Sequence, residues 1–350
     1  MSLSHSGVRA AHRPGPRAAI GLAAALALAS ACVSARAQPQ AQTQTQTQTQ
    51  DASSYPSKMI RITVPNPAGG TSDVLARLLG KELGDALKQP VVVENKAGAN
   101  GHIGASFVAK SAPDGYNLLL LDMSVLTIGP AVMPQLNYSP AKDLTPIAIP
   151  AYSPHLLVVR HDLPAKNIDE LAAYARKSGQ PVSFGTPLAA ISQLAGIQLA
   201  QTKGFEFNVI GYKGGAQALA DLAGGQIDSA MASVLATKPL VTGGKVKAIA
   251  VTSAGPFAAT PGVPTVASQI PDFVTGSWQG LLAPAGTPPA ILDKLQTEIQ
   301  RIVARPDIRK RLEELGSEPA DMNRAQIAQW MQAESARWGK VVKEHGIKAE

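Results

Sequence analysis

The stretch that decides the fold is Val64-Pro65-Asn66-Pro67-Ala68-Gly69-Gly70-Thr71-Ser72-Asp73. An apolar run from Ile60 precedes it and an amphipathic run to Leu87 follows it, which predicts a strand, a tight glycine loop and a helix. The two glycines let the main chain turn sharply with its N–H groups open, and Thr71 or Ser72 can cap the helix. Such a helix start attracts a carboxylate or phosphate, so the loop is either an anion site or simply an economical turn.

The first 37 residues have the composition of a secretory leader. Arg9, Arg13 and Arg17 precede an apolar run at 18–31, and a small-residue cleavage signal ends at Ala37. The apolar run is too short to span a bilayer, so we expect a signal peptide over 1–37 and a periplasmic protein. Cys32, the only cysteine, leaves a lipoprotein anchor open as the weaker alternative.

Residues 38–54 are rich in Gln and Thr and cannot bury a core, which predicts a disordered tether. The chain that follows is long enough for two domains. Four of the 32 Lys and Arg residues lie in the leader, so the exported chain is nearer to neutrality than the formal charge of +7 indicates. Because no basic cluster interleaves with aromatic residues, we expect no nucleic-acid partner.

Apolar segments alternate with helical segments after residue 87. Pro90 to Asn95 and Tyr116 to Leu121 are interpreted as buried strands of a parallel sheet that helices cover on both faces. Ligands of such sheets lie beyond the carboxyl ends of the strands. This rule places residues 66–72, 96–100 and 122–124 along one rim.

Two passages are expected to join the domains. Leu144 to Arg160 is interpreted as two short strands separated by Pro150 and Pro154, and residues 278–283 as the return crossing. Domain 1 is then 55–153 plus 277–350, and domain 2 is 154–276. Domain 2 repeats the strand, glycine loop and helix unit, with a strand at Phe205 to Ile210, the loop Gly211-Tyr212-Lys213-Gly214-Gly215 and a helix at Ala216 to Ala223.

The end of the chain is predicted to be helical. Thr287 is expected to cap a helix whose first residue is Pro288, and Asn323 begins a later helix with a capping pair. Trp330 and Trp338 follow at helical spacing. We expect both tryptophans to pack the C-terminus onto domain 1, rather than to stack on a ligand.

Several kinds of chemistry have no motif in this sequence. Once the leader is removed, the histidines are His102, His155, His161 and His345, and no two of them have metal-ligand spacing. No nucleophile elbow and no phosphate-binding P-loop occurs. We therefore expect neither a metal, nor a cofactor, nor an enzyme, but a protein that binds a small anion in a cleft between two domains.

Several stretches, taken together and in order, resemble a known family. The chain from Tyr55 to Ile347 is similar to the extracytoplasmic substrate-binding receptors of tripartite tricarboxylate transporters, the Bug family. The stretches that carry the resemblance are Tyr55-Pro56-Ser57-Lys58, Pro67-Ala68-Gly69-Gly70, Asp73-Val74-Leu75-Ala76-Arg77, Val91-Val92-Val93-Glu94-Asn95-Lys96, Ala112-Pro113-Asp114-Gly115-Tyr116, Tyr212-Lys213-Gly214-Gly215-Ala216, Gly224-Gly225-Gln226-Ile227-Asp228 and Gly280-Leu281-Leu282-Ala283-Pro284-Ala285-Gly286-Thr287-Pro288.

The resemblance implies a type II periplasmic-binding-protein fold of the α/β class. Two α/β domains, joined by two crossing strands, close on a ligand that is usually a carboxylate. The loop at 66–72 would hold one carboxylate through main-chain N–H groups and water, and a loop of domain 2 would hold the other end of the ligand. The resemblance also implies membrane transporter subunits as partners, and we expect the receptor to act as a monomer.

The sequence departs from this family at positions that bear on the ligand. The domain 2 loop reads Pro187-Leu188-Ala189-Ala190 where the family commonly has a Gly-x-Gly-Ser run, and Asn66 stands where an apolar residue is usual. Asp122 stands where a small residue is common. It would repel a carboxylate or accept an amine if it faces the cleft; otherwise it caps a helix or lies in a solvated turn. We expect a mono-acid with a hydrocarbon or aromatic body rather than a symmetric dicarboxylate.

These considerations give a set of expected ligand contacts and a function. The expected contacts are Asn66, Ala68, Gly69, Gly70, Thr71, Ser72, Asp73, Asp122, Ser124, Thr186, Ala189, Ala190, Gly214 and Gly215. The expected function is delivery of a small carboxylate to a tripartite tricarboxylate-type transporter. The alternatives are a sensor that reports the same ligand to a signalling partner and, least favoured, a secreted enzyme.

Overall fold

The computed structural model describes residues 54–348, apart from 134 and 213. The signal peptide and almost all of the tether expected from the sequence lie outside these residues. The strands are β1 (Ile60–Val64), β2 (Val91–Asn95), β3 (Asn117–Asp122), β4 (Leu144–Arg160), β5 (Val182–Pro187), β6 (Phe207–Tyr212), β7 (Ser229–Ser233), β8 (Val246–Val251) and β9 (Gly276–Pro284).

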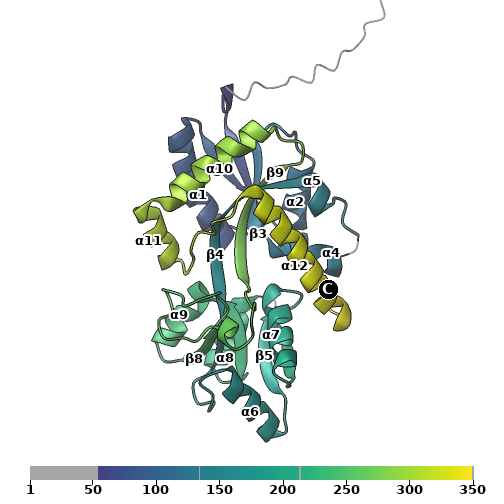
Figure 1. The fold of residues 1–350 in the computed structure, drawn as a ribbon, viewed down its shortest axis with the longest axis vertical. Coiled ribbons are helices and arrows are strands. Elements are labelled where there is room, and N and C mark those ends of the chain that lie inside the picture. Colours follow the sequence, from purple (N-terminus) through teal and green to yellow (C-terminus); the bar gives the residue numbers. More distant parts are fainter. Residues whose placement is uncertain (1–53, 134, 213, 349–350) are drawn as a thin grey trace, which may run out of the picture. The chain divides into compact units, whose positions relative to one another are not determined.

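Helices occupy most of the chain between these strands (Figure 1). The α-helices are α1 (Thr71–Leu87), α2 (His102–Ala109), α3 (Ser124–Thr127), α4 (Gly129–Val132), α5 (Pro140–Asp143), α6 (Ile168–Ser178), α7 (Ile191–Thr202), α8 (Gly215–Ala223), α9 (Val234–Thr242), α10 (Pro289–Ala304), α11 (Pro306–Glu314) and α12 (Arg324–Glu344). Two short 3-10 helices, η2 (Ala99–Gly101) and η3 (Val266–Ser268), complete the set. No helix among the described residues is long and apolar enough to cross a membrane.

The strands form one sheet in the order β2-β1-β3-β9-β4-β7-β5-β6, with β8 paired to β4. β1 runs parallel to β2 and β3, and β5 runs parallel to β6 and β7, as the apolar runs predicted. β9 pairs antiparallel with both β3 and β4. Strand β4 divides the sheet, because Leu144 to Pro154 pairs with β9 whereas His155 to Arg160 pairs with β7 and β8. We call the strands on the two sides of this division the first and second strand sets.

The interpretation of residues 144–160 as two separate strands is wrong, because β4 is continuous over all 17 residues. Its prolines are accommodated by irregular pairing: the register with β9 shifts between Pro146 and Ala148 and again between Ala148 and Ala151. Bulges of this kind leave positions where a proline without an N–H group costs no ladder hydrogen bond. A single strand therefore belongs to both strand sets.

Apolar side chains alternate between the two faces of each strand set. In β3, Leu118 and Leu120 join the core under α1 and α10, whereas Leu119 and Leu121 join a second core under α2 and the start of α12. The second strand set has equivalent cores, one shared with α6 and α7 and the other with α8 and α9. Helices thus cover both faces, which forces the functional groups to the strand ends and loops.

The C-terminal helix α12 packs on both strand sets, which corrects the expectation that both tryptophans lie against the first. Trp330 lies against the core of the first strand set under α2, and its ring is tilted by 47° to that of Trp278, with ring centroids 4.9 Å apart. Trp338 is fully buried in the core of the second strand set, together with Leu194 of α7. Arg337 adds a hydrogen bond of 2.7 Å from Nη2 to Oε1 of Gln198. In Figure 1, α12 extends from beside β9 towards α7.

The helix ends follow the predicted caps in part. Asn323 caps α12, and the side chain and main chain of Gln326 complete the capping box as expected. The expectation for α10 is wrong by one residue, since Pro288 is the N-cap and the helix begins at Pro289. The hydroxyl of Thr287 instead donates 2.8 Å to the carbonyl of Pro284, which closes the preceding turn.

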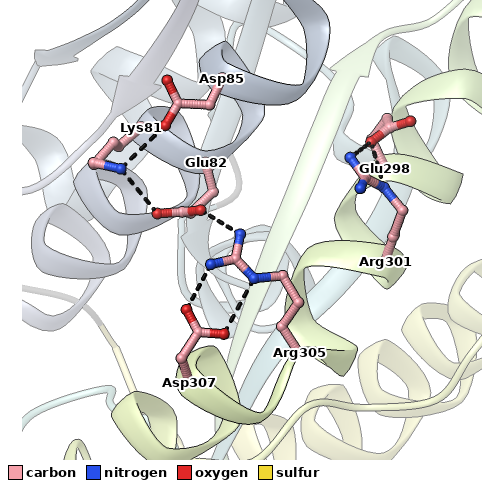
Figure 2. Close-up of polar contacts among 7 residues, drawn as sticks. All are labelled: Lys81, Glu82, Asp85, Glu298, Arg301, Arg305 and Asp307. Atoms are coloured by element: carbon pink, nitrogen blue, oxygen red, sulfur yellow. Dashed lines mark hydrogen bonds and ion pairs between the residues drawn. The ribbon is translucent and has the colours of Figure 1, made fainter.

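Charged side chains join α1 to the start of α11 on the protein surface, and Figure 2 shows them together with a separate pair within α10. The guanidinium of Arg305 contacts Glu82 at 2.5 Å and Asp307 at 2.5 Å. Lys81 bridges Glu82 at 3.2 Å and Asp85 at 3.1 Å. Exposed pairs contribute roughly 0–1 kcal/mol each, so the apolar contacts between α1 and α10 dominate this interface.

Candidate functional site

A hollow of about 830 Å³ lies between loops of the two strand sets. From the first set it is lined by Asn66, after β1, and by Asp122 and Ser124, after β3. From the second set it is lined by Ala189 and Ala190, in the loop between β5 and α7. The structure thus brings together five of the residues that the sequence assigned to a ligand site, from segments far apart in the chain.

The glycine loop after β1 borders a second, smaller hollow of about 190 Å³. Gly69, Gly70 and Thr71 line it, opposite Ala151 of β4 and Leu235 of α9. Because Asn66 lines the larger hollow, the loop between β1 and α1 borders both. The start of α1 therefore lines the smaller hollow, which also contacts residues of both strand sets.

The remaining expected contacts lie outside both hollows. Ala68 is exposed on the loop. Thr186 is fully buried, and its hydroxyl is 2.8 Å from that of Ser192. Gly214 and Gly215 begin α8 and are not among the residues that line either hollow, whereas the neighbouring Tyr212 lines the larger one. Ser72 and Asp73 are also buried, and each holds a neighbouring element in place.

Asp73 holds the glycine loop from inside. One carboxylate oxygen accepts a hydrogen bond of 2.8 Å from the main-chain N–H of Gly69. The other accepts a hydrogen bond of 3.0 Å from Nδ2 of Asn95 and forms an ion pair with Arg77 at 2.9 Å. The hydrogen bond from Arg77, followed by that from Gly69, lowers the pKa of Asp73 to about 2. The N–H of Gly69 is therefore not open for a ligand, which corrects the expectation for that glycine.

The lowered pKa of Asp73 predicts a pH dependence of stability. Its folded-state pKa lies below the usual value, so its contribution is present above about pH 4 and is lost as the pH falls towards 2. We expect Asp73→Asn to lower the free energy of unfolding by about 1–3 kcal/mol at pH 7, and by progressively less below pH 4. Urea titrations at several pH values measure this difference. A constant difference between pH 6 and pH 2.5 would contradict the assignment.

A chain of hydrogen bonds joins Ser72, at the start of α1, to Asp122, at the end of β3. Ser72 Oγ donates 2.7 Å to Oε1 of Gln279, and Gln279 Nε2 donates 2.8 Å to Oγ of Ser277. Ser277 Oγ in turn donates to Oδ2 of Asp122. Ser277 and Gln279 are two residues apart on β9 and so face the same side. The predicted capping role of Ser72 is thus wrong, because Gly70 is the N-cap of α1 without a side-chain bond.

Gln279 is the central member of this chain, and it is almost completely buried. We expect Gln279→Leu to lower the free energy of unfolding by about 1–3 kcal/mol, since it leaves the hydroxyl of Ser72 without its acceptor in a buried site. The control is Gln332→Leu, at an exposed position of α12. Equal stability of the two variants in urea would show that the chain of hydrogen bonds contributes nothing to the fold.

Asp122 faces the larger hollow and also shapes the turn into α3. Its Oδ1 accepts the main-chain N–H of Ser124 at 2.9 Å. Burial raises the pKa of Asp122, and the hydrogen bonds from Ser277 and Ser124 oppose that rise. Among the described residues, no Lys or Arg lines the hollow and Asp122 takes part in no ion pair.

Two buried histidines also line the larger hollow, and sequence reasoning did not assign them to the site. His102 Nδ1 lies 2.8 Å from the hydroxyl of Tyr138, and burial lowers the pKa of the ring. His155 is 6% exposed, its Nδ1 has no hydrogen-bond partner, and burial lowers its pKa to about 4. Both rings are therefore neutral at pH 7. The only sequence signal for His102 was its place directly after the loop that ends at Gly101.

The loop between β5 and α7 presents a second helix start to the hollow. Ala189 has a left-handed conformation (φ 55°), and its N–H donates 2.6 Å to Oε1 of Gln193. α7 begins at Ile191 after Ala190, without a side-chain cap, and both residues line the hollow. The free N–H groups of this helix start and of α1 are the groups in the described site best suited to an anion.

A metal site finds no support in the part of the chain that the structure describes. No group of three or more His, Asp, Glu or Cys side chains there is placed to hold an ion. The polar groups of the hollow are amide, hydroxyl, imidazole and one carboxyl group. This arrangement can bind a small polar molecule by hydrogen bonds.

Comparison with known proteins agrees with this description. Residues 75–347 match the family model described as "Tripartite tricarboxylate transporter family receptor". A protein of Agrobacterium vitis, described as a UPF0065 protein in the TAR-I ttuE-ttuC' intergenic region, is 38% identical over 298 residues, which are 84% of this chain and 86% of the relative.

Solved structures extend the similarity to the fold. A Rhodopseudomonas palustris protein solved with adipate has a TM-score of 0.73 and 33% identity, covering 84% of this chain and 99% of the other. MatC of the same species, solved with bound malate, has a TM-score of 0.69 and 32% identity, covering 82% and 100%. The fold is that of periplasmic binding proteins, as the resemblance implied. The chain belongs to the receptor family of tripartite tricarboxylate transporters.

Proposed function

We propose that this protein is a periplasmic receptor that binds a small carboxylate between its two strand sets and delivers it to a tripartite tricarboxylate-type membrane transporter. The observation that carries the proposal is that two helix starts face spaces lined by both strand sets: the start of α1 lines the smaller hollow and the start of α7 lines the larger one. The relatives solved with adipate and malate support a carboxylate as the ligand.

Capture would follow from closure of two domains, 55–153 plus 277–350 and 154–276. A carboxylate held at Gly70 and Thr71 would accept their N–H groups, and the start of α7 would approach from the other domain. Charge-assisted hydrogen bonds are worth about 1.5–3 kcal/mol each and a helix end adds about 0.3–1 kcal/mol. After ordering costs, about 5–8 kcal/mol remains, which corresponds to affinities from roughly 100 µM to 1 µM.

The closure of the two domains would also control delivery of the ligand to the membrane partner. The closed form has a shape that only the bound ligand stabilises, and a transporter that prefers this form takes the loaded receptor. Since the family consists of receptors, we propose binding without turnover.

The test is a binding screen with protein purified in the mature form. Isothermal titration with linear mono- and dicarboxylates of four to six carbons is expected to give at least one micromolar ligand. Proton NMR of the same mixtures after a day should show the acid unchanged. Absence of binding throughout the panel would refute the carboxylate assignment, and conversion of the acid would refute a pure receptor.

A further inference from the structure

Asp122 places a carboxyl group in the larger hollow, and no positive side chain among the described residues pairs with it. Its two oxygens accept from Ser124 and Ser277, which are neutral donors. Among the described residues that line the hollow there is no Lys and no Arg, and the two histidines are neutral. A buried carboxylate without a cation is costly, because desolvation is not offset by an opposite charge.

The rest of the hollow also offers acceptors rather than cations. Oδ1 of Asn66 is buried without a hydrogen-bond partner. Nδ1 of His155 also lacks a partner, and it accepts a hydrogen bond in the tautomer that carries its proton on Nε2. Both residues line the hollow together with Asp122. A ligand with a second carboxylate at this end would meet like charge and unpaired acceptors, whereas a ligand with N–H donors would satisfy them.

We propose that Asp122 selects a ligand with two different ends: a carboxylate, held at the helix starts, and a protonated amine, held by Asp122. The inference rests on the proposed receptor function and narrows its ligand class to amino-carboxylates. The ammonium supplies a cation that the described residues lining the hollow do not provide. Ser277 and Gln279 act as positioning residues, because their hydrogen bonds keep Oδ2 of Asp122 in place.

The proposal predicts the sign of a pH dependence. Burial raises the pKa of Asp122 in the free protein, and a bound ammonium lowers it, so binding releases a proton. Affinity for an amino-carboxylate should therefore rise with pH through the pKa of Asp122 and then level off, whereas affinity for a dicarboxylate should fall. Among the described residues, the other titratable groups that line the hollow are His102, His155 and Tyr212. Burial lowers the pKa of both histidines and raises that of Tyr212, so none of these groups changes its charge near pH 7 and causes the same rise in affinity.

The experiment compares three acids of the same length that differ only at one end: 6-aminohexanoate, hexanoate and adipate. If the carboxylate screen selects another chain length, the three acids of that length replace them. We expect the amino acid to bind wild-type protein about ten- to a hundredfold more tightly than either of the others at pH 7. Titrations at increasing pH should show its affinity rising until Asp122 is ionised, since its amine stays protonated up to about pH 10.

Asp122→Asn removes the charge and keeps the shape. It should abolish the preference for the amine and the pH dependence, and it should improve binding of adipate. Asp85→Asn is the matched control, because it removes one aspartate from the exposed face of α1 and should leave all three affinities unchanged. The wild-type pH profile needs no variant and so tests the proposal even where Asp122→Asn does not fold.

The possible outcomes separate the two proposals. If adipate or hexanoate binds wild-type protein at least as tightly as the amino acid, the inference about Asp122 is wrong and the carboxylate receptor stands. An amine preference that persists in Asp122→Asn overturns the role of this residue. If no acid of the whole panel binds, the receptor function itself is refuted, and the inference falls with it.

Discussion

Replacement of Gly70 by valine is expected to abolish carboxylate binding while leaving the fold intact. The backbone at Gly70 is extended (φ −75°, ψ 169°), and an added Cβ would meet only the carbonyl of Pro67, at 3.6 Å. Valine adopts this conformation readily, so thermal unfolding should be almost unchanged. Its branched side chain would cover the free N–H groups at the start of α1, and affinity should fall at least about a hundredfold.

A matched control is available on α12. Gly339→Val adds the same side chain at a helical glycine with no atom within 4 Å of the new Cβ, and it should retain full binding. Isothermal titration of both variants with one ligand from the screen makes the comparison. Unchanged affinity in Gly70→Val would remove the loop after β1 from the site and leave the start of α7 as the only anion position.

Truncation of Trp338 to alanine should cause the largest loss of stability. The side chain is fully buried among residues of the second strand set, and truncations of this size cost about 3–5 kcal/mol. The change also removes the hydrogen bond of 2.6 Å from the indole N–H to Glu334. Hydrogen exchange should show that the amides of α7 lose protection, because this helix packs against α12.

Two further variants separate packing from hydrogen bonding. Trp338→Phe keeps most of the buried area but loses the N–H donor, so we expect a loss of about 1–2 kcal/mol. Trp330→Ala truncates a partly buried tryptophan that lies against the core of the first strand set under α2, and it should leave the exchange of α7 unchanged. Equal effects of the Trp330 and Trp338 truncations on α7 would contradict the packing of α12 described above.

Local patterns predicted the parallel strands and the glycine loop well, because each depends on residues close together in the sequence. β1, β2 and β3 coincide with the apolar runs. The same reasoning failed for β4, where prolines indicated a break that irregular pairing with β9 makes unnecessary. Register shifts depend on the partner strand, so the prolines of β4 alone could not indicate them.

The candidate site was harder to predict because its contacts join distant residues. The loop after β1, Asp122 and the loop after β5 were found from strand ends. The hydrogen bond from Ser72 to Gln279 spans 207 positions, and only the fold reveals that Ser72 does not cap its helix. The hydrogen bond from the N–H of Gly69 to Asp73 depends on the conformation of the turn, so the sequence did not indicate it although the two residues are only four positions apart.

The path of α12 limits how this receptor can be divided or recombined. The half of the helix that carries Trp338, Val341 and Val342 completes the core of the second strand set, although it lies far from that set in the sequence. A fragment of residues 154–276 produced alone would expose this apolar surface and should aggregate. Chimeras that exchange ligand preference between relatives must therefore transplant the end of α12 together with residues 154–276.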